Sequence, residues 1–348
     1  MVQVPNQNVY KRLVFQNIEN ALSELNAEDK GHYYICNCPE CNQHEAFMYK
    51  NNINYIQCNR ENHCGERMLL QYHDKNNQVH YKKEDMQTKN KSLTREQQEA
   101  LTWITRLFSY AKKYIPSSTL DHGYRGISKE VSRTHIADLQ KEELVQLFFQ
   151  QASVLLNKNY EKNDWMCKRN LIIPLYGGGQ TPDRVLLRSS IDPNLEPKEI
   201  QLIMNPSKET RDFFVDVPKG ARTIVFSESI IDALSFREVD NTCGFIALTG
   251  ASKTRKVADY IQNNKEIFEN KQLLLAMDDD PAGWKATQKL VDVLDNTGLS
   301  ANYDLLNYDS AHKDVNEFLQ GNRALFEKRY LHRTNQLSKG KEREMEMP

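Results

Sequence analysis

The spacing of hydrophobic positions changes several times along the chain. Between residues 9 and 25 apolar side chains recur every three or four positions, which predicts an amphipathic helix. Residues 94–114 and 141–156 show the same period, and Thr94 with Gln97 has the spacing of a capping box at the start of the first. We therefore expect helices over all three segments.

Short apolar runs replace the helical period between residues 170 and 204. LIIPLY, RVLLRSS and EIQLIM are separated by glycines and a proline, which predicts a small mixed sheet. After Pro218 the runs TIVFS, GFIALT, QLLLAM and ANYDLL alternate with helix-like segments, the pattern of βαβ units on a parallel sheet. The chain is thus expected to be multidomain, with α+β and α/β parts.

Composition restricts the class of protein without naming a function. Of the 348 residues 39% are hydrophobic, enough for ordinary cores, and 46 Lys and Arg nearly balance 47 Asp and Glu. No apolar run approaches the roughly 20 residues that span a bilayer. The first residues lack the apolar core of a signal peptide, so the sequence predicts a cytoplasmic protein without a membrane partner.

Five of the seven cysteines fall in one short segment near the N-terminus. Cys38 and Cys41 form a CxxC knuckle, and Cys58 with Cys64 forms a looser second pair. Because tight turns direct paired thiolates to one ion, and zinc prefers a tetrahedron of four ligands, we predict a structural zinc site on a small β-ribbon.

The exact ligand set is open at this stage. His63 precedes Cys64 and could replace it, while Cys36 and His44 flank the first knuckle. The two remaining cysteines of the chain lie beside or within apolar segments, where a buried free thiol is the expected state.

Acidic residues follow the apolar runs of the C-terminal half. Glu228 ends one run, and Asp278 and Asp280 end another, so parallel strands would bring the three together at one sheet edge. Asp232 lies one helical turn after Glu228, and Asp314 follows the fourth strand. Converging carboxylates repel unless cations separate them, so the pattern predicts a divalent-metal site for phosphate chemistry.

Changes in composition divide the chain into four parts. Residues 76–91 are polar and without apolar period, which is typical of a linker. We expect a cysteine domain with its N-terminal helix over 1–85, an α+β region over 86–218, and an α/β domain over 219–332. The charged residues 333–348 are expected to be disordered.

The ordered acids, ESIID followed by DDDPAG and KDVNE, resemble the TOPRIM domain of bacterial-type primases, topoisomerases and some nucleases. CPECNQHEAF with CNRENHCG is similar to the zinc-binding domain of bacterial and phage primases. YRGISKEV and RNLIIPLYGGGQTPDRVLLRSS resemble parts of their polymerase region. The resemblance covers residues from about 30 to 320, in the family's order, and makes 86–218 the first part of a primase polymerase core.

This resemblance implies a DNA primase that makes short RNA primers on single-stranded DNA. Glu228, Asp278 and Asp280 would then bind the catalytic Mg²⁺ or Mn²⁺, with Asp232 and Asp314 as supporting acids. The partners implied are a single-stranded DNA template, nucleoside triphosphates and a separate replicative helicase. A cationic track for template or triphosphate is expected at Lys168, Arg169, Arg184 and Arg188.

Two departures and two alternatives remain. Ser229 stands where the family commonly has glycine, and Asn316 where it has a second acid beside Asp314, so the second metal position is open. The chain has no GxxxxGK[ST] loop, which favours a stand-alone primase of a phage or mobile element over a fused helicase. A metal-dependent TOPRIM nuclease and an inactive single-strand-binding replication or defence protein are the other candidates.

Overall fold

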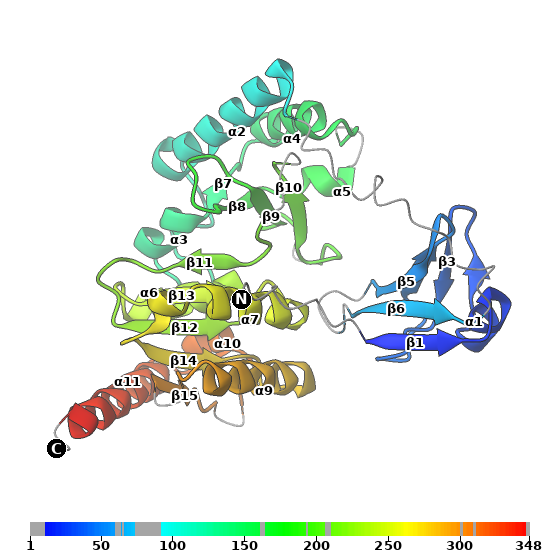
Figure 1. The fold of residues 1–348 in the computed structure, drawn as a ribbon. Helices are drawn as coiled ribbons and strands as arrows, with labels where there is room; N and C mark the ends of the chain where they lie inside the picture. The colour runs from blue at the N-terminus through cyan, green and yellow to red at the C-terminus, as the bar shows by residue number, and fades with distance from the viewer. Residues whose placement is uncertain are drawn as a thin grey trace. The chain divides into compact units, whose positions relative to one another are not determined.

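The computed structural model describes most of the chain in two compact units (Figure 1). The first unit comprises residues 1–88 with 250–252, and the second the rest. The described residues are 11–59, 64, 66–73, 92–160, 164–192, 194–205, 210–299, 302–308 and 311–345. The predicted linker over 76–91 therefore lies outside the described part.

A six-stranded sheet forms the first unit, in the order β1-β6-β5-β4-β3-β2. Its apolar core is small and contains Cys36, Met48, Ile56 and Leu70. The strands are β1 (Arg12–Phe15), β2 (Glu28–Asp29), β3 (Tyr33–Cys36), β4 (Ala46–Tyr49), β5 (Asn52–Cys58) and β6 (Arg67–Tyr72), and the one helix described is α1 (Ile18–Glu24).

The prediction of one helix over residues 9–25 is wrong for its first half, where the chain forms strand β1. β1 pairs in parallel with β6, from Arg12 opposite Leu69 to Phe15 opposite Tyr72. The helix begins only after Asn17, whose side chain accepts a hydrogen bond from the Asn20 amide and so caps α1. The apolar spacing in this segment therefore comes from a strand and a short helix, which both contribute side chains to the same small core.

The second unit begins with an antiparallel sheet covered by helices. The sheet has the order β10-β9-β8-β7, so the predicted mixed sheet is antiparallel throughout. The Thr94–Gln97 capping box is present, and both predicted helices form. The elements are α2 (Arg95–Tyr114), α3 (Lys129–His135), β7 (Ala137–Asp138), α4 (Glu142–Leu156), α5 (Asp164–Cys167), β8 (Leu171–Leu175), β9 (Arg184–Arg188) and β10 (Ile200–Ile203).

The predicted parallel sheet follows, with strand order β11-β13-β12-β14-β15. All pairs are parallel except β11 with β13, so the four predicted runs form the parallel part and β11 an antiparallel edge. The strands are β11 (Phe214–Asp216), β12 (Thr223–Ser227), β13 (Gly244–Ala247), β14 (Gln272–Ala276) and β15 (Tyr303–Leu305); the helices are α6 (Ile230–Val239), η2 (Ala251–Lys253), α7 (Thr254–Asn263), α8 (Lys265–Phe268), α9 (Pro281–Asn296), α10 (Val315–Gly321) and α11 (Arg323–Met345).

One apolar core joins the two sheets of the second unit. Leu171 and Ile173 of the antiparallel sheet belong to the same buried cluster as Val225 of β12 and Leu274 of β14. Beyond the core, the Asp216 carboxylate on β11 accepts a hydrogen bond from His135 at the end of α3, at 2.9 Å. The regions predicted as separate domains over 86–218 and 219–332 thus share one interior.

The C-terminal segment is helical where disorder was predicted. α11 continues to Met345, so the helix assignment includes residues 333–345. Its first half is fixed by packing, since Phe326 and Tyr330 are fully buried in the core. The following Lys, Glu, Arg and Met residues are good helix formers, which lets the helix continue without an apolar period. Among the described residues, no helix is both long and apolar enough to cross a bilayer.

Candidate metal centres

Four cysteines of the first unit bring their sulfur atoms together. The Sγ atoms of Cys38, Cys41, Cys58 and Cys64 all lie within 4.8 Å of one another. The Cys38–Cys64 and Cys41–Cys58 distances are 3.7 and 3.8 Å. Sulfurs at the corners of a tetrahedron with zinc–sulfur bonds of about 2.3 Å would be separated by about 3.8 Å. The donor set and its spacing therefore fit a structural zinc ion.

The knuckle owes its shape to a short turn after β3. The Cys38 amide donates to the Gln43 carbonyl and the Asn42 amide to the Cys38 carbonyl, both at 2.8 Å. Asn42 adopts φ +58°, a left-handed conformation that asparagine tolerates better than most residues. This turn directs the thiols of Cys38 and Cys41 to the same side.

The other candidate zinc ligands lie elsewhere or outside the described residues. Cys36 is fully buried in the core of the unit, where burial raises the pKa of its thiol to about 12. The His44 Nδ1 atom is 2.8 Å from the Asn37 side-chain oxygen, and its Nε2 is 3.7 Å from Glu28. His63 lies outside the described part of the chain. Neither Cys36 nor His44 belongs to the sulfur cluster.

The predicted acids gather at the carboxyl ends of the parallel strands. Glu228 directly follows β12, and Asp278 comes two residues after β14. Asp280 and Asp314 are the N-caps of α9 and α10, and Asp232 lies in the first turn of α6. The structure thus brings all five to one edge of the sheet, as the strand pattern predicts.

Asp278 is the electrostatic centre of this group. Burial, followed by the charges of Asp232, Glu228, Asp314 and Asp280, raises the pKa of Asp278 to about 9. Its Oδ1 atom is buried and has no hydrogen-bond partner among the described residues. A carboxylate of this kind is costly to ionise alone, and a bound cation would remove that cost.

Asp280 also stabilises the start of α9. Its Oδ1 accepts hydrogen bonds from the amides of Ala282 and Gly283, at 2.9 and 2.8 Å, and so caps α9. A Cβ atom at Gly283 would overlap the main chain of Asp278. Gly283 is therefore needed for close approach of the helix start to the strand end. The cap and the glycine together fix the two aspartates relative to each other.

Asp232 and Asp314 are also engaged by neighbouring groups. The Asp314 side chain accepts a hydrogen bond from the Glu317 amide at 2.7 Å. Asp232 is buried, and its two oxygens accept from the Ser229 hydroxyl at 2.6 Å and the Asn316 amide at 3.0 Å. Burial, together with the charge of Asp314, raises the pKa of Asp232 to about 6. Both acids suit the supporting role expected of them.

The two departures from the family pattern have structural explanations. Ser229 caps α6 through the Asp232 amide, a task for which a hydroxyl is well suited. The buried Asn316 side-chain amide donates to the Arg125 carbonyl and the Ser235 hydroxyl, both at 2.9 Å. Asn316, on α10, thus links the RGIS segment (residues 125–128) to α6. This link requires an N–H donor, which an ionised carboxylate lacks.

Three residues near the acids escaped the sequence analysis. Arg125, in the RGIS segment, lies close enough to Asp232 to favour its charged form. The Tyr308 hydroxyl is buried without a hydrogen-bond partner among the described residues, and burial together with the nearby aspartates raises its pKa well above the usual value. The exposed Trp284 indole donates to Asp279 at 2.7 Å. The acid motif next to Trp284 was a signal that could have identified it.

The predicted cationic track is not an open row of charges. Arg169 is fully buried and donates to the carbonyls of residues 197 and 198, so its side chain is not exposed for contact with nucleic acid in this structure. Arg184 donates to Thr210 and Gln201 at 2.7 and 2.9 Å. The remaining pairs are Arg188 with Glu199 at 3.1 Å and the half-exposed Lys168 with Asp192 at 3.7 Å.

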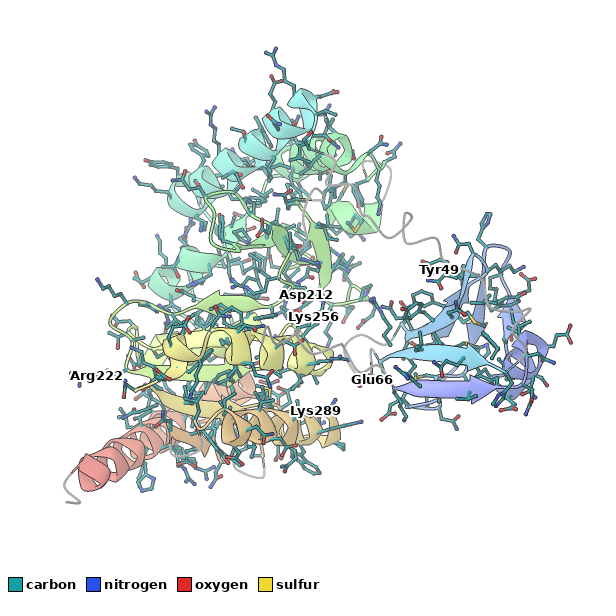
Figure 2. All side chains as sticks on the ribbon, in the orientation of Figure 1. Tyr49, Glu66, Asp212, Arg222, Lys256 and Lys289 are labelled. Carbon is teal, nitrogen blue, oxygen red and sulfur yellow. The ribbon has the colours of Figure 1, made fainter. Side chains whose placement is uncertain are left out.

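A different cationic group lies beside the loop after β13. The Thr249 hydroxyl, in this loop, donates to the Asp212 carbonyl at 2.7 Å. The buried Asp212 carboxylate pairs with Lys253 at 3.3 Å and with Lys256 (Figure 2). These lysines neutralise Asp212 and hold the loop close to β11.

Residues 225–319 match a family model described as Toprim-like. Among solved structures, the chain is similar to the zinc-binding and RNA polymerase domains of the Aquifex aeolicus primase, with 14% identity, 92% of this chain and 83% of that chain covered, and a TM-score of 0.49. It is similar to the primase fragment of the bacteriophage T7 primase-helicase protein, with 19% identity, coverage of 60% and 71%, and a TM-score of 0.41.

A DNA primase domain from Pseudomonas aeruginosa is also similar, with 15% identity, 67% and 78% coverage, and a TM-score of 0.44. None of the curated proteins matches the chain in sequence. The family match spans β12 to α10 and includes all five acids. The acidic centre is therefore the carboxyl-end site of a Toprim-like domain.

Proposed function

We propose that this protein is a DNA primase, which joins ribonucleotides into short RNA primers on single-stranded DNA. The observation that carries the proposal is Asp278, a partly buried carboxyl group with one buried, unpartnered oxygen among four further acids in a Toprim-like domain. Such a group is suited to hold divalent ions. The cysteine unit in the same chain separates this arrangement from a Toprim domain alone.

In the proposed reaction the 3′ oxygen of one nucleotide attacks the α-phosphorus of a nucleoside triphosphate, and pyrophosphate leaves. Glu228, Asp278 and Asp280 would hold Mg²⁺ or Mn²⁺, which neutralises the triphosphate and stabilises the leaving group. Asp280 is kept in place by its cap on α9, and Asp232 by Ser229 and Asn316. The chain's own contribution is thus a set of preoriented carboxylates.

The first unit is proposed to hold zinc and to bind the template. Tyr33 on β3 and Tyr49 on β4 are 37% and 52% exposed. Their rings are arranged edge to face, with 6.4 Å between the ring centroids. Phe47 packs against Tyr49 at 5.4 Å. Lys50 lies 5.0 Å over the Tyr34 ring. Exposed rings beside a cation suit the stacking of single-stranded bases. A separate helicase would be the remaining partner.

Primer synthesis on single-stranded DNA, with ribonucleoside triphosphates and Mg²⁺ or Mn²⁺, tests the proposal. We expect short oligoribonucleotides from the wild type and none from Asp278→Ala. The matched control is Asp259→Ala, which removes an exposed aspartate on α7. Undiminished synthesis by Asp278→Ala would exclude this site as the catalytic one.

The same assay separates the proposed function from its alternatives. If the protein cleaves labelled DNA in the presence of metal ions and without nucleotides, and makes no primers, the result would favour a nuclease. If neither activity appears, calorimetry of Mn²⁺ binding to the wild type and to Glu228→Gln decides whether the acids hold metal. Equal binding would support an inactive single-strand-binding protein.

A further inference from the structure

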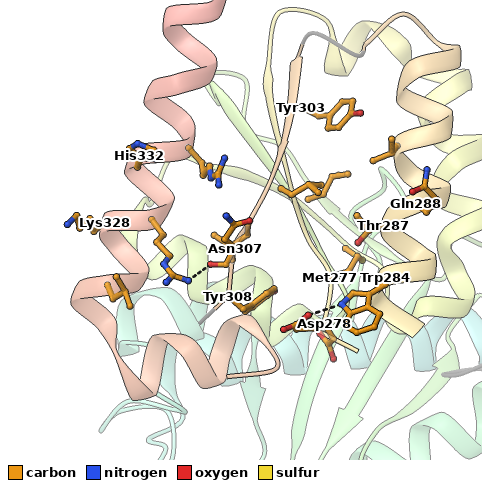
Figure 3. Close-up of a pocket in the computed structure, with 18 residues that line it drawn as sticks. Met277, Asp278, Trp284, Thr287, Gln288, Tyr303, Asn307, Tyr308, Lys328 and His332 are labelled. Carbon is orange, nitrogen blue, oxygen red and sulfur yellow. Dashed lines mark hydrogen bonds between the residues drawn. The ribbon is translucent and has the colours of Figure 1, made fainter. Parts of the chain in front are cut away.

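A pocket of about 1060 Å³ lies beside the acidic centre and shares Asp278 with it, whereas the two helices that line the pocket have no role in the proposed metal chemistry (Figure 3). Its floor is formed by β14 and β15, with Leu275 and Met277 buried and Leu305 40% exposed. α9 and α11 form the two walls. The pocket has the size and the mixed apolar and polar lining typical of small-ligand sites.

The α9 wall presents one helical face. Trp284, Thr287, Gln288 and Val291 follow at helical spacing, over a length of about 10 Å. Figure 3 places Trp284 and Asp278 at one end of the pocket and Tyr303 at the other. The wall thus offers an aromatic surface, then an amide and a hydroxyl that can form hydrogen bonds.

Trp284 is exposed and yet held in position. Its side chain is 60% exposed, although indoles are usually largely buried. The Nε1 atom donates to Asp279 Oδ1 at 2.7 Å, so the ring orientation is fixed. A fixed, exposed indole is a surface on which a flat ring can stack without a further loss of side-chain freedom.

The α11 wall is basic. Lys328, Arg329, His332 and Arg333 line it. Arg329 donates to the Asn307 carbonyl at 2.6 Å, and Arg333 pairs with Asp304 at 3.1 Å. These contacts hold the two guanidinium groups beside the pocket.

We propose that this pocket binds an unpaired nucleotide, with its base on Trp284 and its phosphate against the cations of α11. An aromatic surface opposite a basic wall complements the two halves of a nucleotide, and stacking of this kind tolerates any base. The nucleotide is either free in solution or part of a strand passing the acidic centre. The inference deepens the proposed function, because it adds a substrate contact next to the same carboxylates.

Tryptophan fluorescence locates the ligand without requiring synthesis. Zinc-loaded wild type, without added Mg²⁺ or Mn²⁺, is titrated with ATP, with a short oligothymidylate and with inorganic triphosphate, and Trp284→Phe is titrated in parallel. We expect quenching that is absent in the variant, from ATP if the ligand is a free nucleotide and from oligothymidylate if it is a strand. Quenching by triphosphate alone, or equal quenching in both proteins, would overturn the proposal.

Affinity gives the second measurement. Loss of one base stack predicts about tenfold weaker binding of the quenching ligand to Trp284→Ala. Tyr110→Ala, which removes a 57% exposed ring from α2, is the matched control and should bind like the wild type. Equal affinity of all three proteins would refute the stacking surface. Because no Mg²⁺ or Mn²⁺ is added, nucleotide binding can succeed or fail independently of primer synthesis.

Discussion

The cysteine cluster and the acidic centre are both candidate metal sites, but the structure prepares them differently. The four sulfurs already lie at the spacing of zinc ligands, within 4.8 Å of one another. Among the residues that the structure describes, no three carboxylates reach that spacing. Thiols gathered in a small core suit a permanent ion that supports the fold. Separated acids suit ions that arrive with a charged substrate, and the raised pKa values of Asp232 and Asp278 show how costly ionisation is there without an ion.

Removal of zinc should have the largest effect. Cys58→Ser, or a strong chelator, should unfold the first unit, because its small core depends on the ion and structural zinc contributes on the order of 10 kcal/mol. Metal analysis and thermal unfolding of the full chain measure this. Cys36→Ser, which changes a buried thiol outside the cluster, should retain zinc. Full zinc content in Cys58→Ser would contradict the ligand set.

The acidic centre should respond in the opposite direction. Asp278→Asn should abolish primer synthesis and yet stabilise the protein in the absence of Mg²⁺ or Mn²⁺ by roughly 1–3 kcal/mol, because it replaces a partly buried carboxyl group that neighbouring acids make costly to ionise. Thermal unfolding of the zinc-loaded proteins without added Mg²⁺ or Mn²⁺ gives the difference in stability. Asp259→Asn serves as the surface control. A destabilised Asp278→Asn protein would mean that the carboxylate contributes to folding.

Asn316 allows a test of whether a sixth acid is tolerated. Asn316→Asp should destabilise the metal-free protein by about 2–4 kcal/mol, because it loses the donor to Arg125 and adds a buried charge beside Asp232. Mn²⁺ should restore part of this loss if the new carboxylate reaches the ion. Asn316→Ala measures the hydrogen bonds alone. Wild-type stability of both variants would dismiss the link between segments.

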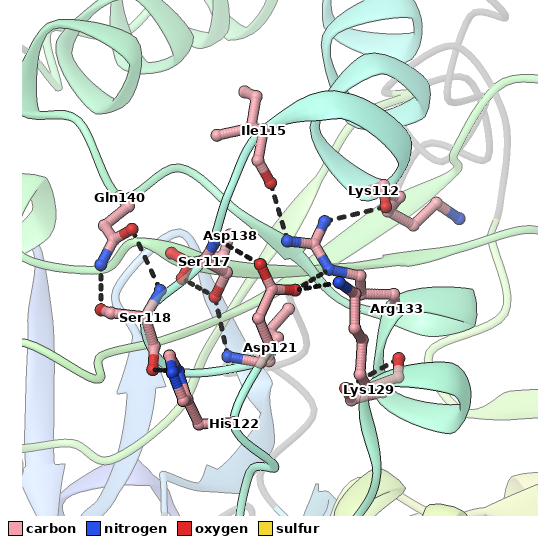
Figure 4. Close-up of polar contacts among 12 residues, drawn as sticks. Lys112, Ile115, Ser117, Ser118, Asp121, His122, Lys129, Arg133, Asp138 and Gln140 are labelled. Carbon is pink, nitrogen blue, oxygen red and sulfur yellow. Dashed lines mark hydrogen bonds and ion pairs between the residues drawn. The ribbon is translucent and has the colours of Figure 1, made fainter.

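A carboxylate that belongs to neither centre shows the usual behaviour of a paired acid. Asp121 accepts a hydrogen bond from Arg133 at 2.6 Å, and this bond holds the pKa of the carboxyl well below its usual value (Figure 4). Its stabilisation is therefore present above about pH 4 and lost as the pH falls. Asp121→Asn should cost about 1–2 kcal/mol at neutral pH and little in acid. The free energies of unfolding of the wild type and of Asp121→Asn are measured across pH. A difference between them that does not change with pH would mean that the pairing is unimportant.

The smallest effect is expected at the exposed rings of the first unit. Tyr49→Ala should weaken binding of single-stranded DNA a few-fold, by loss of one stacking surface, and leave zinc content and stability unchanged. Fluorescence anisotropy with a labelled oligonucleotide measures the affinity. Tyr110→Ala is again the control. Equal binding by both variants would place the template contact elsewhere.

The sequence predicted the parallel sheet because β12, β13 and β14 are almost wholly apolar, which is typical of strands covered on both faces. It placed the acids for the same reason, since they follow those strands. The first helix was misassigned because β1 is only four residues long and shares a buried side with α1. Short strands depend on partners distant in sequence, which a local period does not register.

The site was predicted less completely than the sheet. Charge and position identified Asp278, but only the fold shows that Arg169 is buried and that Trp284 faces a pocket. Both depend on contacts between segments far apart in the chain. The role of Asn316 likewise depends on Arg125, which lies 191 residues earlier.

The side-chain amide of Asn316 also bears on which fragments of this protein could fold alone. A fragment beginning near residue 219 would retain the whole parallel portion of the sheet and every acid of the centre. It would lose the Arg125 carbonyl, and with it the acceptor of a buried N–H group. The Toprim-like part is therefore a recognisable sequence module without being an independent physical one, and transfer of its activity to another protein would require the RGIS segment as well.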